Sequence, residues 1–171
     1  MPASYRAPGR GPVKEKTYSQ SVDKALSETA RVHHVLESKG GDVITILASD
    51  TIATAVTVLR DKRIGALVVV DATGALEGIL SERDIVRKLA ETPGQTLPQT
   101  VAENMTPNVV TCTGQETLVT VLRRMSEGRF RHMPVVENGT LLGMVTIGDV
   151  VTFRLNELEH ETLQLKQLIV G

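Results

Sequence analysis

The chain has 171 residues, a net charge of −1 at pH 7, and 41% hydrophobic but only 2% aromatic residues, which allows one compact core or two small intertwined cores. The lack of a basic surface and of aromatic stacking residues argues against a nucleic-acid partner, and no apolar run approaches the about 20 residues that span a membrane. The single cysteine, Cys112, excludes an internal disulfide, so we expect a protein of a reducing compartment, the cytoplasm, without a membrane partner.

Residues 1–20 are rich in proline and glycine and also carry several basic residues. This composition predicts a disordered basic tail. The basic, serine-containing start is also compatible with an organelle transit peptide, although the prolines disfavour the amphipathic helix that such a peptide forms. Two locations therefore stay open, the cytoplasm and, after removal of the tail, an organelle matrix.

Apolar residues recur at helical spacing from residue 21 onward, and Gly40-Gly41 ends the pattern. This predicts an N-terminal helix over residues 21–40, which contains His33 and His34. Adjacent residues of a helix point in different directions, so these two histidines cannot bind one metal ion as an i, i+4 pair would. We expect no metal site in the chain.

The main feature of the sequence is an internal repeat. Residues 50–52 match residues 116–118, and residues 78–85 match residues 143–150. The two offsets differ by one residue, and that difference falls in a predicted hairpin loop, where a duplicated folded unit tolerates a change of length. We therefore predict a first repeat over residues 41–91, a Pro- and Gly-containing linker over 92–100, and a second repeat over 101–154.

Each repeat has the pattern strand–helix–strand–strand–helix. In the second repeat, Asn138-Gly139 between two apolar runs is a strong signal for a tight hairpin. In the first repeat, Asp50 is the expected N-cap of the first helix. Cys112 matches Ile46 of the first repeat, so we interpret it as a core residue. The predicted elements are residues 43–46, 51–62, 64–70, 76–80 and 81–89, then 109–112, 117–127, 133–136, 141–145 and a helix from 148.

The last helix outlasts its counterpart in the first repeat and forms an extension over residues 155–171. Its apolar residues are spaced 3 and 4 apart in turn, as in a coiled-coil seam, at Leu155, Leu158, Thr162, Leu165 and Ile169. So short a seam does not hold a coiled coil alone, and the helix must pack on its own domain or on a second subunit. We favour a homodimer, with intramolecular docking as the alternative.

Two corners between strand and helix combine a hydroxyl with an acid three residues later: Ser81 with Asp84, and Thr146 with Asp149. Such a corner presents the hydroxyl, free backbone N–H groups and the carboxylate beside each other, which suits a ligand with phosphate and ribose. An acid in this position is also a common helix cap, so both interpretations stay open.

These two repeats, each ending in Gly, two apolar residues, Ser or Thr, any two residues, Asp and an apolar residue, resemble the tandem CBS domain pair, or Bateman module, of the small stand-alone type. The resemblance implies an α/β (α+β) fold of two intertwined repeats with pseudo-two-fold symmetry, plus an N-terminal and an extended C-terminal helix. It also implies a regulatory module, without catalysis, that binds adenosine nucleotides between the repeats. AMP is favoured, and ADP, ATP, NAD(H) and S-adenosylmethionine are open.

The resemblance also implies residue roles. Asp84 and Asp149 would hold ribose hydroxyls, and Ser81 and Thr146 would bond ribose or phosphate. Ile79 and Met144 would pack on adenine, and the backbone near Ile44, Thr45, Val110 and Thr111 would read the base edge. Arg131 and His132 would meet phosphate. The remaining candidate residues come from the same motifs or from repeat one: Ile64, Gly65, Ala66, Arg83, Met133 and Pro134.

The repeats differ at the positions that would meet phosphate. Gly65-Ala66 stands where repeat two has Arg131-His132, whereas Arg83 stands where repeat two has Gly148. We expect the site with Asp84 to handle phosphate best, and the site with Asp149 to take a less charged ligand. Two other functions stay open: a structural dimer with vestigial sites, and an enzyme acting on a nucleotide, although no nucleophile-elbow, phosphate-loop or zinc-protease motif occurs.

Overall fold

The computed structural model describes residues 30–170, with side chains described up to Leu168. The predicted tail and the first part of the predicted N-terminal helix therefore lie outside the described residues. Of that helix, the structure describes α2, Val32–Lys39. The prediction of one continuous helix is wrong at Ala30 and Arg31, because Arg31 is extended and bridges to Thr117.

The first repeat has the predicted order of elements, β1 (Thr45–Leu47), α3 (Ile52–Lys62), β2 (Ala66–Val70), β3 (Leu76–Ser81) and α4 (Glu82–Glu91). Strand β2 pairs in parallel with β1 and antiparallel with β3. Every residue of β2 is buried, as expected for an apolar strand in a sheet that is covered on both faces.

The second repeat contains α6 (Leu118–Gly128), β5 (His132–Glu137), β6 (Thr140–Thr146) and the long α7 (Ile147–Val170). Strands β5 and β6 are antiparallel. The turn between them has positive φ at both Asn138 (50°) and Gly139 (78°), as a two-residue type I′ hairpin requires, so the hairpin prediction is confirmed.

The predicted strand over residues 109–112 is wrong, because only an isolated parallel bridge from Cys112 to Val135 forms. The cause lies in β5. In the first repeat, Val68 N donates a 3.3 Å hydrogen bond to Ile44 O of the incoming segment. The residue at the matching place in β5 is Pro134, which has no N–H to donate. The parallel pairing therefore lacks this hydrogen bond and is reduced to one isolated bridge.

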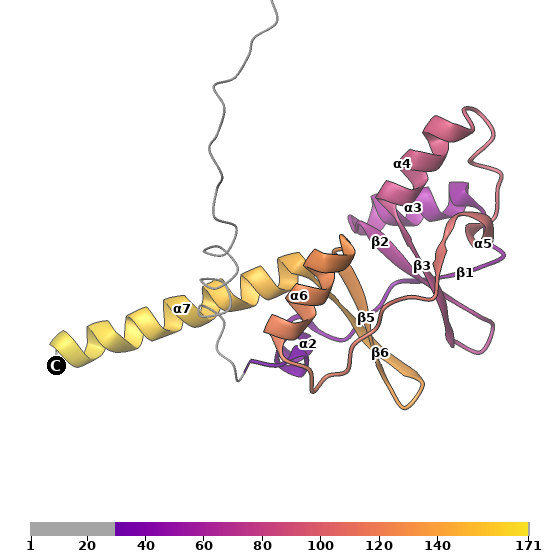
Figure 1. Ribbon diagram of the computed structural model, residues 1–171. Helices are drawn as coiled ribbons and strands as arrows, with labels where there is room; N and C mark the ends of the chain where they lie inside the picture. Colours follow the sequence, from indigo (N-terminus) through magenta and orange to yellow (C-terminus); the bar gives the residue numbers. More distant parts are fainter. Residues whose placement is uncertain (1–29, 171) are drawn as a thin grey trace, which may run out of the picture.

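The two repeats exchange their leading segments. Helix α5 (Val101–Asn104) precedes repeat two in the chain but lies on repeat one, where Val101 N donates to Asp50 O at 2.8 Å. The strand after it, β4 (Thr106–Pro107), extends the sheet of repeat one in the order β1-β2-β3-β4 and is an element that the sequence analysis missed. Conversely, α2 precedes repeat one but lies beside β6 and α7 of repeat two (Figure 1).

A strand glycine accommodates each exchanged segment. A Cβ on Gly143 of β6 would lie 2.8 Å from Leu36 Cδ2 of α2. At the matching position of repeat one, a Cβ on Gly78 of β3 would lie 2.6 Å from Met105 Sδ and 3.0 Å from Thr106 O. The 2.8 Å and 2.6 Å distances are shorter than a Cβ atom tolerates, so these glycines allow α2 and the segment after α5 to approach the sheets closely.

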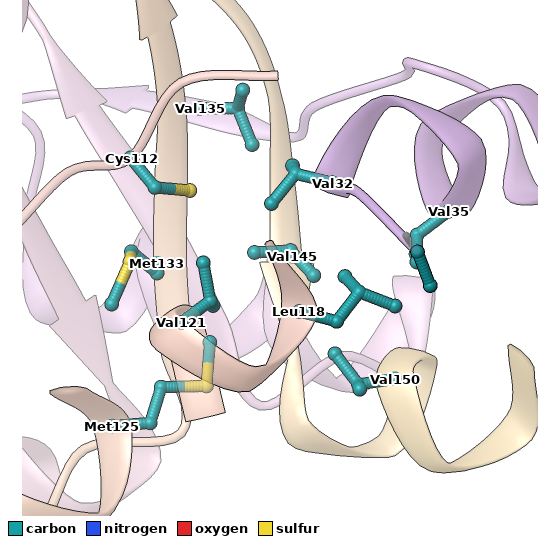
Figure 2. Close-up of a cluster of buried hydrophobic side chains, with 11 residues drawn as sticks. Val32, Val35, Cys112, Leu118, Val121, Met125, Met133, Val135, Val145 and Val150 are labelled. Carbon is teal, nitrogen blue, oxygen red and sulfur yellow. The ribbon is translucent and has the colours of Figure 1, made fainter. Parts of the chain in front are cut away.

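Two buried apolar clusters result, one for each repeat. In the cluster of repeat one, Val101 of the exchanged α5 packs with Ile52, Leu67 and Leu80. The cluster of repeat two likewise contains Val32 and Val35 of the exchanged α2 (Figure 2). Cys112 belongs to the second cluster, and burial raises the pKa of its thiol to about 12, so its interpretation as an apolar core residue is confirmed.

The helices α3 and α6 are capped by threonine. Thr51 Oγ1 accepts from Thr54 N at 3.2 Å, and Thr117 Oγ1 accepts from Thr120 N at 3.3 Å. The prediction that Asp50 caps α3 is therefore wrong by one residue. The carboxylate of Asp50 instead accepts a 3.1 Å bond from Leu47 N in the preceding turn. Within residues 30–170, no helix is both long enough and apolar enough to cross a membrane.

Candidate ligand-binding cleft

A cavity of about 920 Å³ lies between the two repeats and is lined by residues of both. This volume falls in the range of small-molecule sites, roughly 300–1,000 Å³. The starts of α4 and α7, which carry the two hydroxyl–acid corners, both open into it. Fourteen predicted site residues line the cavity: Ile44, Ile64, Gly65, Ala66, Ile79, Ser81, Arg83, Asp84, Val110, Arg131, His132, Met144, Thr146 and Asp149.

Four predicted site residues lie outside this lining. Met133 and Pro134 are buried in β5, and of this strand only His132, at its start, lines the cavity. The carbonyl of Thr111 accepts a 2.7 Å bond from Arg124 of α6. Thr45 lines a separate, smaller hollow of about 430 Å³ beside the two hairpin tips.

The cavity also has lining residues that the sequence analysis missed. Most of them flank a predicted motif, so they could have been found by extending each motif by two or three residues. Lys39 could not, because its place in the cavity depends on α2 crossing to repeat two. The additional residues are Lys39, Asp42, Val43, Glu82, Arg87, Thr106, Asn108, Val109, Gly128, Arg129, Phe130, Ile147 and Gly148.

The first corner is a reciprocal cap. Asp84 Oδ2 accepts from Ser81 N at 3.0 Å and from Ser81 Oγ at 2.6 Å, and Asp84 N donates to Ser81 Oγ at 3.4 Å. The second oxygen, Oδ1, accepts a 2.8 Å bond from Arg87 one turn along α4. The capping interpretation is therefore confirmed for this corner. A carboxylate has about four acceptor positions, so capping leaves capacity for a ligand hydroxyl.

The second corner repeats this arrangement with a cation from another element. Asp149 Oδ2 accepts from Thr146 N at 2.9 Å, and Asp149 N donates to Thr146 Oγ1 at 3.0 Å. Lys39 Nζ, at the end of α2, lies 2.6 Å from the same carboxylate oxygen. The exchange of α2 therefore places a charged amine beside Asp149, in the site for which we expected a less charged ligand.

Charges of both signs surround the cavity. Its basic side chains come from α2, α4 and the loop between α6 and β5. Arg83 of α4 reaches across the cleft and donates a 3.1 Å bond to Arg129 O after α6. The lining contains Lys39, Arg83, Arg87, Arg129 and Arg131 together with Asp42, Glu82, Asp84 and Asp149. Such a lining suits a ligand that carries both an anionic group and neutral hydroxyls.

His132 sits where the two repeats meet. A Cβ on Gly65 would lie 3.6 Å from His132 Nε2 and 3.6 Å from Glu82 Oε2, so the imidazole faces repeat one. Burial lowers the pKa of His132 below its usual range, and Arg131 lowers it further, whereas Asp149 and Glu82 oppose the shift. The ring is therefore neutral at neutral pH.

The lowered pKa of His132 predicts a pH dependence of stability. As the pH falls through about 6.5, the unfolded chain protonates this ring before the folded protein does, so the free energy of unfolding decreases. We expect the melting temperature of the wild type to fall further between pH 7.5 and pH 5.5 than that of the His132→Gln variant. The other described histidines are the same in both proteins, so their contribution cancels in this difference. Equal losses in the two proteins would contradict the predicted shift.

Among the described residues, no group of three or more His, Cys, Asp or Glu side chains is arranged to hold a metal ion. The model of the CBS domain matches residues 32–91 and 100–156, which are the two repeats with their leading segments. The chain therefore belongs to the CBS domain family, and the predicted tandem CBS pair and its fold class are confirmed.

Known proteins of this family align with most of the chain. The mitochondrial CBS domain-containing protein CBSX3 of Arabidopsis thaliana is 31% identical over 165 residues, covering 92% of this chain and 80% of that protein. The chain spans only 29% of the longer Arabidopsis protein CBSCBSPB2. The crystal structure of ATU1752 from Agrobacterium tumefaciens has a TM-score of 0.72 and 42% identity, covering 75% of this chain and 96% of that one.

One solved relative contains ligands. The CBS domain pair of protein MJ0100 was crystallised in complex with 5′-methylthioadenosine and S-adenosyl-L-methionine. It has a TM-score of 0.66 and 28% identity, and the match covers 77% of this chain and 98% of that chain. Adenosine compounds thus bind to a CBS pair of the same fold.

Proposed function

We propose that the protein is a regulatory module that binds an adenosine nucleotide in the cleft between its CBS repeats. The observation that carries this proposal is that both hydroxyl–acid corners open into one cavity. The Asp84 and Asp149 carboxylates can accept two hydrogen bonds each from a ribose cis-diol. The adenosine compounds bound to MJ0100 support the choice of adenosine.

The lining favours a ligand with phosphate, and we place AMP first, ahead of ADP, ATP, NAD(H) and S-adenosylmethionine. The guanidinium groups of Arg83 and Arg131, which both line the cavity, would bind phosphate through their rigid donor forks. Near Asp149, the Lys39 amine supplies a further positive charge. A ribose on Asp149 would compete with the Lys39 amine, which could then turn toward phosphate.

The proposed output is a change in the angle between the repeats. Arg83 spans the cleft by its bond to Arg129 O, and a phosphate that captured this guanidinium would break that bond. A ligand shifts such an equilibrium only by its different affinity for the two states. A partner protein, or the second subunit of a homodimer, would respond to this change.

Thermal shift and calorimetry with AMP, ADP, ATP, NAD and S-adenosylmethionine test the proposal. A ligand present at about 100 times its Kd should raise the free energy of unfolding by about 2.7 kcal/mol. No shift with any of these compounds would contradict nucleotide sensing and favour the structural dimer, and turnover of a nucleotide would favour an enzyme.

Variants locate the binding. The Asp84→Asn and Asp149→Asn changes retain an oxygen for the cap but remove the charge, so each should weaken AMP binding at its own corner by about tenfold or more. Asp61→Asn on the exposed face of α3 is the matched control, and its Kd should equal that of the wild type. Two variants that bind as tightly as the control would contradict the assigned site.

We also propose a cytoplasmic location, with an organelle matrix as the alternative. The alternative is supported by the mitochondrial name of the Arabidopsis relative and by the basic residues of the tail. Imaging of a C-terminal fluorescent fusion, with and without residues 1–20, distinguishes the two. Organelle signal that needs the tail would replace the cytoplasmic proposal.

A further inference from the structure

Helix α7 leaves the body of the protein soon after it begins (Figure 1). Its first turns pack on repeat two, where Val150 is buried and Phe153 lies against the apolar cluster. Further along, large apolar side chains are exposed, with 56% of Leu155 and 60% of Leu165 accessible. Exposed leucines at this density are unusual on a helix that stays unpartnered.

Most of the exposed apolar residues of α7 form one seam, and Leu163 and Leu168 lie outside it. Val151, Leu155, Leu158, Thr162 and Leu165 are spaced 4, 3, 4 and 3 residues apart, with Leu155 and Thr162 at heptad position a and the others at d. At about 100° per residue, this seam lies about a third of a turn away from the side that carries Val150 and Phe153. Repeat two therefore does not cover the seam, and a second helix can lie along it.

The charges beside the seam favour one arrangement of that second helix. Arg154 and Glu161 occupy heptad position g, and Glu159 and Lys166 occupy position e. In a parallel, in-register pair, position g faces position e of the other helix five residues later. Within its own helix, Arg154 lies 3.1 Å from Glu157 and 3.7 Å from Glu161. In a parallel pair Arg154 also faces Glu159 of the partner subunit, and Glu161 faces the partner subunit's Lys166, so both pairs join opposite charges.

An antiparallel pair cannot satisfy both sets of charges. There, position g faces g and position e faces e, so Arg154 would need one register to meet the opposite Glu161. Glu159 would need a different register to meet the opposite Lys166. The two registers exclude each other, whereas the parallel arrangement uses all four charges at once.

We propose that α7 pairs with α7 of a second copy as a parallel, in-register, two-stranded coiled coil. This inference is independent of nucleotide binding. The seam is shorter than three heptads, so the pairing is weak by itself and depends on protein concentration. It brings the two copies together side by side at the same end, with both clefts facing the same way along the helix pair.

Single cysteines on the seam test the orientation. Leu158→Cys and Leu165→Cys place thiols at two d positions that each face themselves only in a parallel, in-register pair. Under mild oxidation of the full chain, both variants should give a disulfide-linked dimer, and the control Gln164→Cys on the outer face should not. Cys112 does not compete, because it is buried and its thiol has a raised pKa of about 12. Cross-linking at neither position, or at only one, would overturn the proposal.

A charge exchange tests the pairing between chains. Sedimentation equilibrium should show that Glu161→Lys weakens the dimer about five- to tenfold, because lysine then faces the partner's Lys166 at two symmetric places. Adding Lys166→Glu should restore the dimer. Residues five apart on one helix do not face each other, so the rescue must come from the second chain. A double variant weaker than the single one, or a wild type that stays monomeric, would overturn the proposal.

Discussion

The change Leu118→Ala is expected to lower the free energy of unfolding by about 2–5 kcal/mol, and Ile52→Ala by a similar amount. The two residues occupy the matching first positions of α6 and α3, and both are fully buried in the apolar clusters of their repeats. Alanine leaves a cavity in each case. Because the repeats exchange α2 and α5, we expect one cooperative transition in chemical denaturation for both variants rather than loss of a single repeat.

The control for these core variants is Val86→Ala on α4, where 65% of the side chain is exposed. This change should shift the free energy of unfolding by less than about 0.5 kcal/mol. A second, separate transition in either core variant would show that the repeats unfold independently. A loss below 1 kcal/mol at both positions would contradict the buried placement of Ile52 and Leu118.

Replacing either strand glycine at the exchanged segments should cost about 1–3 kcal/mol of stability. Gly78→Val places carbon where Met105 Sδ and Thr106 O lie, and Gly143→Val places it against Leu36. We expect Gly78→Val to cost more, because Thr106 O belongs to the backbone of β4 and cannot turn aside as a side chain can. Urea denaturation measures both.

The neighbouring Glu77→Val change is the matched control for Gly78→Val. Glu77 belongs to the same strand but is exposed, so valine there meets no exchanged segment. The control should stay within about 0.5 kcal/mol of the wild type. A Gly78→Val protein as stable as this control would contradict the close approach of β4 and Met105 to the sheet.

The parts of the fold that depend on local chemistry could be predicted from the sequence. The Asn138-Gly139 hairpin follows from the two positive φ angles that its turn requires. The corners at Ser81 and Thr146 follow from helix capping, which involves residues three apart. The repeat itself then predicts the order of the elements in repeat one and, apart from the strand before α6, in repeat two.

The parts that depend on contacts far apart in the sequence could not be predicted. Nothing near Lys39 indicates that it lies 2.6 Å from Asp149, because that contact needs α2 to dock on repeat two. The strand predicted over residues 109–112 does not form because its partner in β5 is Pro134. The apolar pattern of residues 109–112 carries no information about that partner. The error at the N-cap of α3 has a local cause. Asp50 and Thr51 are both good N-cap residues, and only the backbone geometry of the turn decides that Thr51 caps the helix.

The exchange of leading segments has a consequence during protein synthesis. Repeat one lacks Val101 until that residue leaves the ribosome, and α2 must wait for β6 and Gly143, over a hundred residues later. Its apolar face, with Val32 and Val35, is without its native contacts in the meantime. A nascent chain stalled before β6 should therefore bind a hydrophobic-surface chaperone such as a holdase, and should release it only when the second hairpin emerges.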